Sequence, residues 1–504
     1  MNIQETRAVD AVTRGLFVDN CWQSPASSRM IEIRDPALGG VLQRVAACNA
    51  QDVDLAVQSA RKSLQGDWGL MDSVARAACL SMLAAQIAAA AEGIAKCEAT
   101  DTGKPIEQAR QETESAAHIF ALCSKAALRG ADQRSLILSD GYHCDMARFP
   151  YGVTGHIIPW TAPLLLAART LAPALAMGNA CVIKPSEHAC LTVLRLAELA
   201  REAGFPPGAF NVVTGRGELA GAALSAHAGL DFLSFTGSPE VSTLVQVAAA
   251  RNHIGCAIQR GGKSPHIIFE DADHNAALDA VIPAFTANSG QSCLSGARVL
   301  VHASLACEFI ARLRPKFAAL VAGSPDSEVD LGPVINSMQK RRVERYCRQA
   351  VADSIPVIAS GRIADNAPVE GHFVKPMAFG PVPADHPLAI EDVFGPVLSV
   401  LVFDDEVEAI RLAQSVSCGP LVRLWTGDKE RALRIRRALP AAELLWNSRA
   451  PERDDAFQAW LWTEGDLDLI KAETGLGHFS TPRLLRWRDH GERIPSDAKR
   501  TLEA

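Results

Sequence analysis

Two short glycine-containing stretches carry the side chains of this sequence that could do covalent chemistry. Residues 289–293 read Ser-Gly-Gln-Ser-Cys, and a cysteine on such a tight loop is a candidate nucleophile, because a thiolate attacks electrophilic carbon. Residues 259–265 read Gln-Arg-Gly-Gly-Lys-Ser-Pro, a run whose glycines could bring a second polar side chain against that cysteine. That side chain is Gln259, and an amide cannot accept a proton at ordinary pH as a carboxylate would.

Cysteine usage separates this candidate from the other thiols of the chain. The 13 cysteines are scattered singly, without a Cys-x-x-Cys pair and without two histidines at metal-ligand spacing. We therefore expect no disulfide framework, no metal site and a reducing, cytoplasmic environment. The other cysteines are interpreted as small buried apolar side chains. For Cys293 the residues alone leave two interpretations open, a buried structural thiol and a loop nucleophile.

Length and composition indicate a multidomain globular protein. The 504 residues are 48% hydrophobic and 21% charged, so two or three domains are expected. A formal net charge of −7 and a pI near 6.0 provide no broad basic surface, which argues against nucleic acid or an anionic membrane as partners. The most apolar stretches, 161–177 and 77–95, are interrupted by residues such as Arg169 and Glu92, and residues 1–14 lack a signal-peptide pattern. Small molecules and other subunits are the expected partners.

The elements that would position the two glycine-containing stretches begin with an edge hairpin region. Residues 15–47 predict short strands and turns, and the apolar spacing over 52–64 and 73–116 predicts long helices. We expect a break at Gly103-Lys104-Pro105 and helix to about Arg129. Residues 135–149 alternate as a strand does.

From Gly152 strands and helices alternate, which predicts a parallel sheet covered by helices. The predicted strands are 153–158, 180–183, 210–213, 232–235 and 256–259. One predicted helix starts at about residue 164, and three more span 191–203, about 217–226, and 239–250. A second alternating block, 266–425, has strands at 267–269, 298–301 and 398–403 and predicts a second α/β domain that the cysteine loop opens. Ligands of such sheets bind at the carboxyl ends of the strands, so a nucleotide site is expected there.

Two motifs directly follow predicted strands of the first block. Residues 184–187 (Lys-Pro-Ser-Glu) offer a cation and a carboxylate that could bind a ribose, although the motif taken alone is more typical of an ordinary surface turn. Residues 235–238 (Phe-Thr-Gly-Ser) end the next such strand, and the following helix start could face a pyrophosphate. Residues 257–264 begin with Ala257 where a phosphate-binding P-loop requires glycine, which excludes that motif.

Six motifs, taken in this order, resemble the NAD(P)-dependent aldehyde dehydrogenase superfamily. They are Ile158–Trp160, Lys184–Glu187, Phe235–Ser238, Gly261–Pro265, Gly290–Cys293 and Glu391–Val397. Together with Asp101–Pro105 the resemblance covers roughly residues 15 to 480. Six ordered motifs make chance a poor explanation, so the sequence is identified as a member of this superfamily.

The resemblance implies an α/β, aldehyde dehydrogenase-like fold, with two parallel-sheet domains and a small β oligomerisation flap. It implies an NAD-binding domain from 1–131 and 151–258 with part of 446–470, a catalytic domain from 259–445, a flap from 132–150 and 471–490, and a polar tail from 491–504. Members of the family are usually dimers or tetramers, so the resemblance also implies a homodimer or homotetramer.

The resemblance also assigns roles to single residues. In the family a cysteine thiolate attacks an aldehyde, its backbone N–H and an asparagine hold the oxyanion, hydride passes to the nicotinamide, and a glutamate activates water. Cys293 matches the nucleophile. The implied cofactor positions are Ile158, Pro159, Trp160, Lys184, Ser186, Glu187, Gly217, Phe235, Gly237, Ser238, Gly261, Asp392 and Phe394. A carboxylate at Glu187 would bind a free 2′-hydroxyl and repel a 2′-phosphate, which favours NAD over NADP.

The departures from the family pattern fall on the chemistry. Thr161 replaces the oxyanion asparagine, and losing one such donor costs about 2.7–4 kcal/mol of transition-state stabilisation. Gln259 replaces the glutamate, an effect on the order of 10²–10⁴ in rate. Thr170 stands where many members carry lysine, Asp392 replaces the ribose-binding glutamate, and residues 456–462 carry two tryptophans where the family has glycines.

The sequence therefore predicts an NAD-dependent oxidoreductase that oxidises an aldehyde through a Cys293 thiohemiacetal and thioester, slowly or in altered form. Two alternatives stay open. One is acyl transfer from the Cys293 thioester to a nucleophile other than water, and the other is a catalytically inactive protein that binds NAD or a partner subunit.

Overall fold

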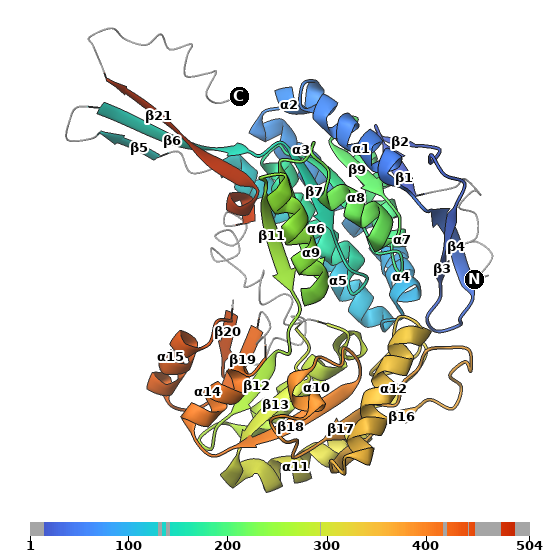
Figure 1. The fold of residues 1–504 in the computed structure, drawn as a ribbon, viewed down its shortest axis with the longest axis vertical. Helices are drawn as coiled ribbons and strands as arrows, with labels where there is room; N and C mark the ends of the chain where they lie inside the picture. Colours follow the sequence, from blue (N-terminus) through green and yellow to red (C-terminus); the bar gives the residue numbers. More distant parts are fainter. Residues whose placement is uncertain are drawn as a thin grey trace.

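The computed structural model describes residues 15–129, 134–137, 142–292, 294–416, 421–441, 443–448 and 475–488. These residues form two α/β units, each built on a seven-stranded sheet, and a small β flap that projects from the first unit (Figure 1). The predicted fold class, two parallel-sheet units with a flap, is confirmed. Cys293, the loop at 456–462 and the tail at 491–504 lie outside the described residues.

The first sheet has the strand order β11-β10-β7-β8-β9-β1-β2. Its strands are β1 (Leu16–Val18), β2 (Cys21–Trp22), β7 (Val153–Ile157), β8 (Ala180–Lys184), β9 (Phe210–Val213), β10 (Phe232–Gly237) and β11 (Gly255–Arg260). The strands from β11 to β9 run parallel, as the alternation after Gly152 predicts, whereas β1 is antiparallel to both of its neighbours. The carboxyl ends of β7, β8, β10 and β11 therefore lie along one edge.

Helices pack on both sides of this sheet (Figure 1). They are α1 (Ala50–Ser63), α2 (Asp67–Leu70), α3 (Ser73–Ala89), α4 (Ala91–Thr102), α5 (Ile106–Arg129), α6 (Pro163–Ala176), α7 (Leu191–Glu202), α8 (Ala222–Ser225) and α9 (Pro239–Arg251). The predicted helix from about Gly217 instead begins as a π-helical turn, Gly217–Gly221, because the Gly221 N–H binds the carbonyl of Arg216 five residues back.

The break between α4 and α5 is where the sequence predicts it. Gly103 adopts a left-handed φ of 84°, and its N–H donates to the carbonyl of Ala99 at 2.8 Å to close α4. Pro105 then directly precedes α5. Lys104 lies between these two residues and is fully buried, which directs its side chain into the protein rather than into solvent.

The second sheet has the order β15-β17-β18-β13-β12-β19-β20, and only β15 runs antiparallel to its neighbour among these described strands. Its strands are β12 (Pro265–Ile268), β13 (Arg298–His302), β15 (Val357–Ser360), β17 (Met377–Phe379), β18 (Val397–Phe403), β19 (Leu421–Trp425) and β20 (Glu443–Trp446). Its helices are α10 (His274–Thr286), the 3₁₀ turn Ala287–Gly290, α11 (Ala303–Ala318), α12 (Ser337–Ala352), α13 (Pro387–Ile390), α14 (Glu406–Gln414) and α15 (Lys429–Ala438). Two small ribbons complete the described strands, β3 (Met30–Arg34) with β4 (Val41–Ala46), and β14 (Val321–Ala322) with β16 (Arg362–Ile363).

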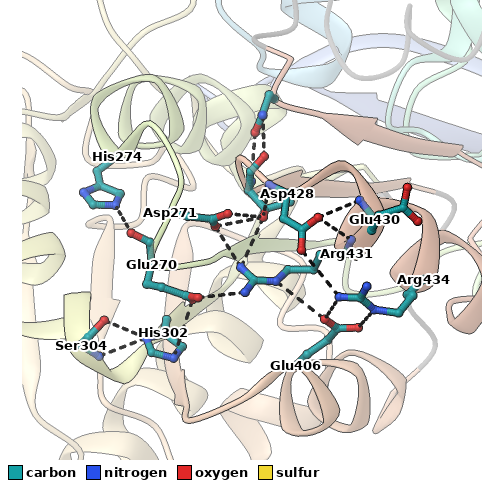
Figure 2. A network of polar contacts seen from close by, with 12 residues as sticks. Glu270, Asp271, His274, His302, Ser304, Glu406, Asp428, Glu430, Arg431 and Arg434 are labelled. Atoms are coloured by element: carbon teal, nitrogen blue, oxygen red, sulfur yellow. Dashed lines mark hydrogen bonds and ion pairs between the residues drawn. The ribbon is translucent and has the colours of Figure 1, made fainter.

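An ion-pair network joins helix ends to strand ends in this second unit (Figure 2). Arg431 donates to Glu270 and to Asp271, each at 2.9 Å, and Arg434 donates to Glu406 at 2.7 Å. The hydroxyl of Thr426, just after β19, also binds Asp271 at 2.9 Å. Exposed pairs contribute about 0–1 kcal/mol each, so the network chiefly fixes α14 and α15 against the ends of β12 and β19.

The flap joins chain segments that are far apart in the sequence. Strand β6 (Tyr142–Pro150) pairs antiparallel with β5 (Arg134–Ile137) and with β21 (Ser480–Arg488). Arg148 fastens the flap to its base, because its guanidinium donates to the hydroxyl of Ser480 at 2.8 Å and to the carbonyl of Gly477 at 2.6 Å. The domain boundaries stay a prediction, and the one at 258 falls inside β11.

A helix that spans a bilayer needs about 20 consecutive, mostly apolar residues. No single described helix is long and apolar enough to cross a bilayer. The two helical segments 50–70 and 73–89, which meet at a bend, are together long and apolar enough by length and composition alone.

Candidate active site

The motif after β8 forms a polar cradle with the turn at Gly217. The ammonium of Lys184 lies 3.4 Å from one carboxylate oxygen of Glu187 and donates to the carbonyl of Pro185 at 2.8 Å. The other oxygen of Glu187 accepts the backbone N–H of Gly217 at 3.2 Å. The predicted residues Lys184, Glu187 and Gly217 are therefore brought together, in a built arrangement rather than an ordinary surface turn.

Electrostatics keep the Glu187 carboxylate charged. Burial raises the pKa of Glu187, but the neighbouring Lys184 ammonium and backbone N–H groups outweigh burial and hold this pKa below its usual value. Burial lowers the pKa of Lys184, and Glu187 opposes that change. An ionised carboxylate that already accepts two donors suits a ribose hydroxyl and repels a phosphate.

Other predicted cofactor positions lie at the same edge of the first sheet. The N–H of Ile158 donates to the carbonyl of Lys184 at 3.2 Å, and the hydroxyl of Ser238 caps α9 by accepting the N–H of Val241 at 3.3 Å. Gly261 reaches this edge through its N–H, which donates to the carbonyl of Gly237 at 3.3 Å. Phe235 is buried within β10, Ser186 is buried and accepts the N–H of His188, and Pro159 is half-buried.

The second unit closes this edge with the loop that follows α13. The rings of Trp160 and Phe394 meet edge to face, with centroids 5.6 Å apart. Phe394 adopts a left-handed φ of 57°, and its N–H donates to the carboxylate of Asp392 at 3.1 Å. Burial raises the pKa of Asp392, and the Lys263 ammonium opposes it. The structure thus brings Asp392 and Phe394 to Trp160.

Lys263 fastens that loop from the connector between the two sheets. Its ammonium donates to the carbonyls of Leu388 and Glu391, at 2.6 and 2.9 Å. Burial lowers the pKa of Lys263 to about 7, and Asp392 opposes the change. The glycine-rich run of the sequence therefore places its lysine against the cofactor loop.

The loop before Cys293 is tightly built, although Cys293 itself lies outside the described residues. Asn288 and Ser289 adopt left-handed φ angles of 45° and 57°. The Gln291 amide is fully buried, donates to the carbonyl of Asn288 at 3.0 Å and accepts the N–H of Ile335 at 3.0 Å. These bonds fix the loop as a tight turn, as its sequence predicts.

A cavity of about 30 Å³ lies beside this loop. It is lined by Gln108, Glu112, Thr161, Ala162, Ala284, Ala287, Asn288, Ser292, Leu294 and Arg423. The structure thus brings Thr161 to the two residues that flank Cys293. Gln259 pairs in register with Thr236 on β10 and is absent from the described lining of this cavity.

The sequence interpretation missed the group that holds Thr161. The carbonyl of Thr161 accepts the Lys104 ammonium at 3.0 Å and the Asn288 amide at 2.9 Å. Lys104 is also paired with Glu112 and lies 3.5 Å from Glu98. Burial lowers the pKa of Lys104, but the two carboxylates outweigh burial and raise it above its usual value. The available signal was the motif at residues 101–105, which contains Lys104.

Thr170, where the resembled family often carries lysine, belongs to a buried uncharged chain. Its hydroxyl lies 2.5 Å from Nδ1 of His156 and donates to Ser234 at 3.0 Å, and Thr154 lies 2.8 Å from Nε2 of that histidine. Burial lowers the pKa of His156 to about 3, so the imidazole is neutral. No charge from this position reaches the site.

Comparisons with known proteins agree with this geometry. A model of the aldehyde dehydrogenase family matches residues 22–460. Betaine aldehyde dehydrogenase, chloroplastic, of Amaranthus hypochondriacus is 34% identical, over 88% of this chain and 90% of that protein. Retinal dehydrogenase 2 of Homo sapiens is 35% identical, over 86% of this chain and 84% of that protein. Among solved structures, betaine aldehyde dehydrogenase from Staphylococcus aureus in complex with NAD+ has a TM-score of 0.88 at 26% identity, covering 98% of this chain and 99% of that one.

We predict that Gly290→Ala disrupts the site. A Cβ at Gly290 would lie 2.3 Å from the carbonyl oxygen of Gly395, and its φ of +73° costs an alanine roughly 1–2 kcal/mol. The added methyl group would push the cysteine loop from the loop that carries Phe394. Isothermal titration calorimetry should show NAD affinity reduced at least about tenfold. Gly40→Ala, where a Cβ meets nothing within 4 Å, is the control; equal affinity in both variants contradicts the prediction.

Proposed function

The chain belongs to the aldehyde dehydrogenase family, and from this premise we propose that it oxidises an aldehyde with NAD through Cys293, slowly because Thr161 and Gln259 replace two catalytic groups of the family. The relatives at similar identity are named for aldehydes as different as betaine aldehyde and retinal. Similarity therefore selects the reaction class, and the aldehyde itself stays unassigned.

The cofactor cradle is the observation that carries the proposal. Lys184, the ionised Glu187 and Gly217 form one connected polar site at the sheet edge, and Trp160 and Phe394 bound the same edge. These groups fit the ribose and the nicotinamide end of a dinucleotide. The Staphylococcus aureus neighbour was solved with NAD+, which supports the same cofactor for this chain. When bound, NAD supplies the hydride acceptor.

The residues of the chain divide the reaction into two parts. In the first, the Cys293 thiolate bonds to the aldehyde carbon, hydride leaves that carbon, and a thioester remains on sulfur. In the second, water attacks the thioester, the carbon–sulfur bond breaks, and a carboxylic acid departs. Thr161 weakens the first part, because a hydroxyl is shorter than the amide that the family uses to hold the oxyanion. Gln259 weakens the second, because it cannot accept a proton from water.

Gln259 also favours a second candidate function. A thioester that water cannot reach efficiently could pass its acyl group to another nucleophile, which would make the protein an acyl-transfer enzyme. If Thr161 prevents acylation altogether, the protein is a non-catalytic NAD-binding or subunit-binding member. The time course of NADH formation separates these outcomes.

The proposal predicts slow turnover that reversion accelerates. The protein mixed with NAD and a panel of aldehydes should form NADH slowly, as measured by the absorbance of NADH. Thr161→Asn combined with Gln259→Glu should raise the steady rate by about 10²–10⁴. Gln65→Glu makes the same chemical change at an exposed position in the turn after α1 and should leave the rate unchanged.

The outcomes decide between the candidates. Robust turnover of the natural chain, with no gain on reversion, would contradict the roles given to Thr161 and Gln259. One equivalent of NADH followed by a stall indicates a thioester that awaits another acceptor. No NADH from the reverted chain contradicts aldehyde oxidation.

We predict that Glu187→Gln relaxes the choice of cofactor. The amide keeps the size of Glu187 but removes the charge that repels a 2′-phosphate, and hydrogen bonds to charged groups contribute about 1.5–3 kcal/mol. The ratio of the NADP to the NAD dissociation constant should fall about tenfold or more, measured by calorimetry. Glu202→Gln, which changes an exposed carboxylate beside Arg195, is the control. An unchanged ratio would remove Glu187 from cofactor selection.

A homo-oligomer is the last part of the proposal. Leu484 and Leu485 are exposed on the flap, and Val241, Leu244 and Val247 are exposed on α9, which supports subunit contacts on these two surfaces. Leu484→Asp should shift sedimentation velocity toward a smaller species, with the exposed Val369→Asp as the control. A natural chain that sediments as a monomer would contradict the oligomer.

A further inference from the structure

The replacement of the family glutamate by Gln259 leaves thioester hydrolysis without its usual base, and one other carboxylate reaches the site. The cavity beside the cysteine loop is lined by Glu112 of α5 together with Thr161, Ser292 and Leu294. Ser292 and Leu294 are the chain neighbours of Cys293. A cavity of about 30 Å³ exceeds the roughly 10–15 Å³ that one water molecule needs.

A shared ammonium fixes the position of the Glu112 carboxylate. Lys104 is paired with a carboxylate oxygen of Glu112, and the same nitrogen donates to the carbonyl of Thr161 at 3.0 Å. The Glu112 carboxylate and the backbone of Thr161 therefore lie within hydrogen-bonding distance of one atom. The Glu112 side chain is 9% exposed and Lys104 is fully buried, so bulk water screens this arrangement weakly.

A second carboxylate lies against the Lys104 ammonium. Glu98, whose side chain is 1% exposed, lies 3.5 Å from the same ammonium and accepts the hydroxyl of Thr192 at 2.6 Å. Two carboxylates thus share one ammonium. The cavity also contains Arg423, whose guanidinium donates to the carbonyl of Leu294 at 3.2 Å, on the chain beside Cys293. Glu112 and Arg423 thus come from different elements that line the same cavity.

We propose that Glu112 is the general base that hydrolyses the Cys293 thioester, in place of the glutamate that Gln259 has replaced. The inference rests on the proposed function. Glu112 accepts a proton from water as the water oxygen bonds to the acyl carbon. The carbon–sulfur bond breaks, and its electron pair leaves on the Cys293 thiolate. The carboxylic acid departs, Glu112 returns its proton to solvent, and no oxidant is consumed.

A purely structural role for Glu112, as a counter-ion of Lys104, is the competing explanation. Glu98 provides the matched control, because it contacts the same ammonium and is absent from the described lining of the cavity. Glu112→Gln and Glu98→Gln each remove one negative charge from Lys104. Only Glu112→Gln removes a carboxylate from the cavity.

The test uses p-nitrophenyl acetate, which acylates a reactive cysteine without NAD or hydride transfer. Nitrophenolate release should show a burst of about one equivalent per subunit, which counts folded and reactive sites, followed by a steady rate set by deacylation. Glu112→Gln should keep the burst and lower the steady rate about 100-fold or more, and intact mass should show an acetyl group retained on Cys293. Glu98→Gln should change both phases by only a few-fold.

Each other result overturns the inference. A steady rate unchanged in Glu112→Gln excludes it as the base, and an equal loss of burst and steady rates assigns it to structure. A natural chain that stalls after the burst has no base, and one without a burst has no nucleophile at Cys293. Failure of the proposed function is distinct: aldehydes then give no NADH, while ester hydrolysis still depends on Glu112.

Discussion

The buried ammonium of Lys104 is the interaction on which the reactive part of the molecule depends. It lies in the break between α4 and α5, contacts Glu98 and Glu112, and binds the carbonyl of Thr161. The side-chain amide of Asn288 donates to that same carbonyl and to the carbonyl of Gln291. The carbonyl oxygen of Thr161 therefore connects the break between α4 and α5 with the loop before Cys293. Removing one partner of a buried ion pair costs about 3–5 kcal/mol, because it leaves a buried charge uncompensated.

The two halves of the site have been altered to different degrees. At the cofactor edge, Lys184 and Glu187 keep a charged cradle, and Lys263 holds the loop that carries Asp392 and Phe394. At the reacting end, an amide and a hydroxyl stand where the family uses a carboxylate and an amide. The cofactor edge thus offers groups that fit NAD, and the two replacements at the reacting end are the reason for the slow oxidation that we propose.

Sequence patterns predicted the elements well and the contacts between them poorly. The strand at 210–213 matches β9, and the break at Gly103 and Pro105 lies where the sequence predicts it, because alternation and glycine–proline breaks are local signals. The motifs also marked the cofactor edge. The pairing of Lys104 with Glu98 and Glu112 was missed, because Glu98 on α4 and Glu112 on α5 come together only when the two helices pack. The chain from His156 through Thr170 to Ser234 was missed for the same reason.

We expect an aldehyde to acylate Cys293 and, because Gln259 cannot accept a proton from water, release of the acyl group to be the slow step. Intact-mass analysis of protein quenched during steady turnover with NAD and an aldehyde tests this most directly. We predict that most molecules carry the acyl group on Cys293 while NADH accumulates slowly. Unmodified protein throughout turnover would place the slow step before the thioester and contradict the account.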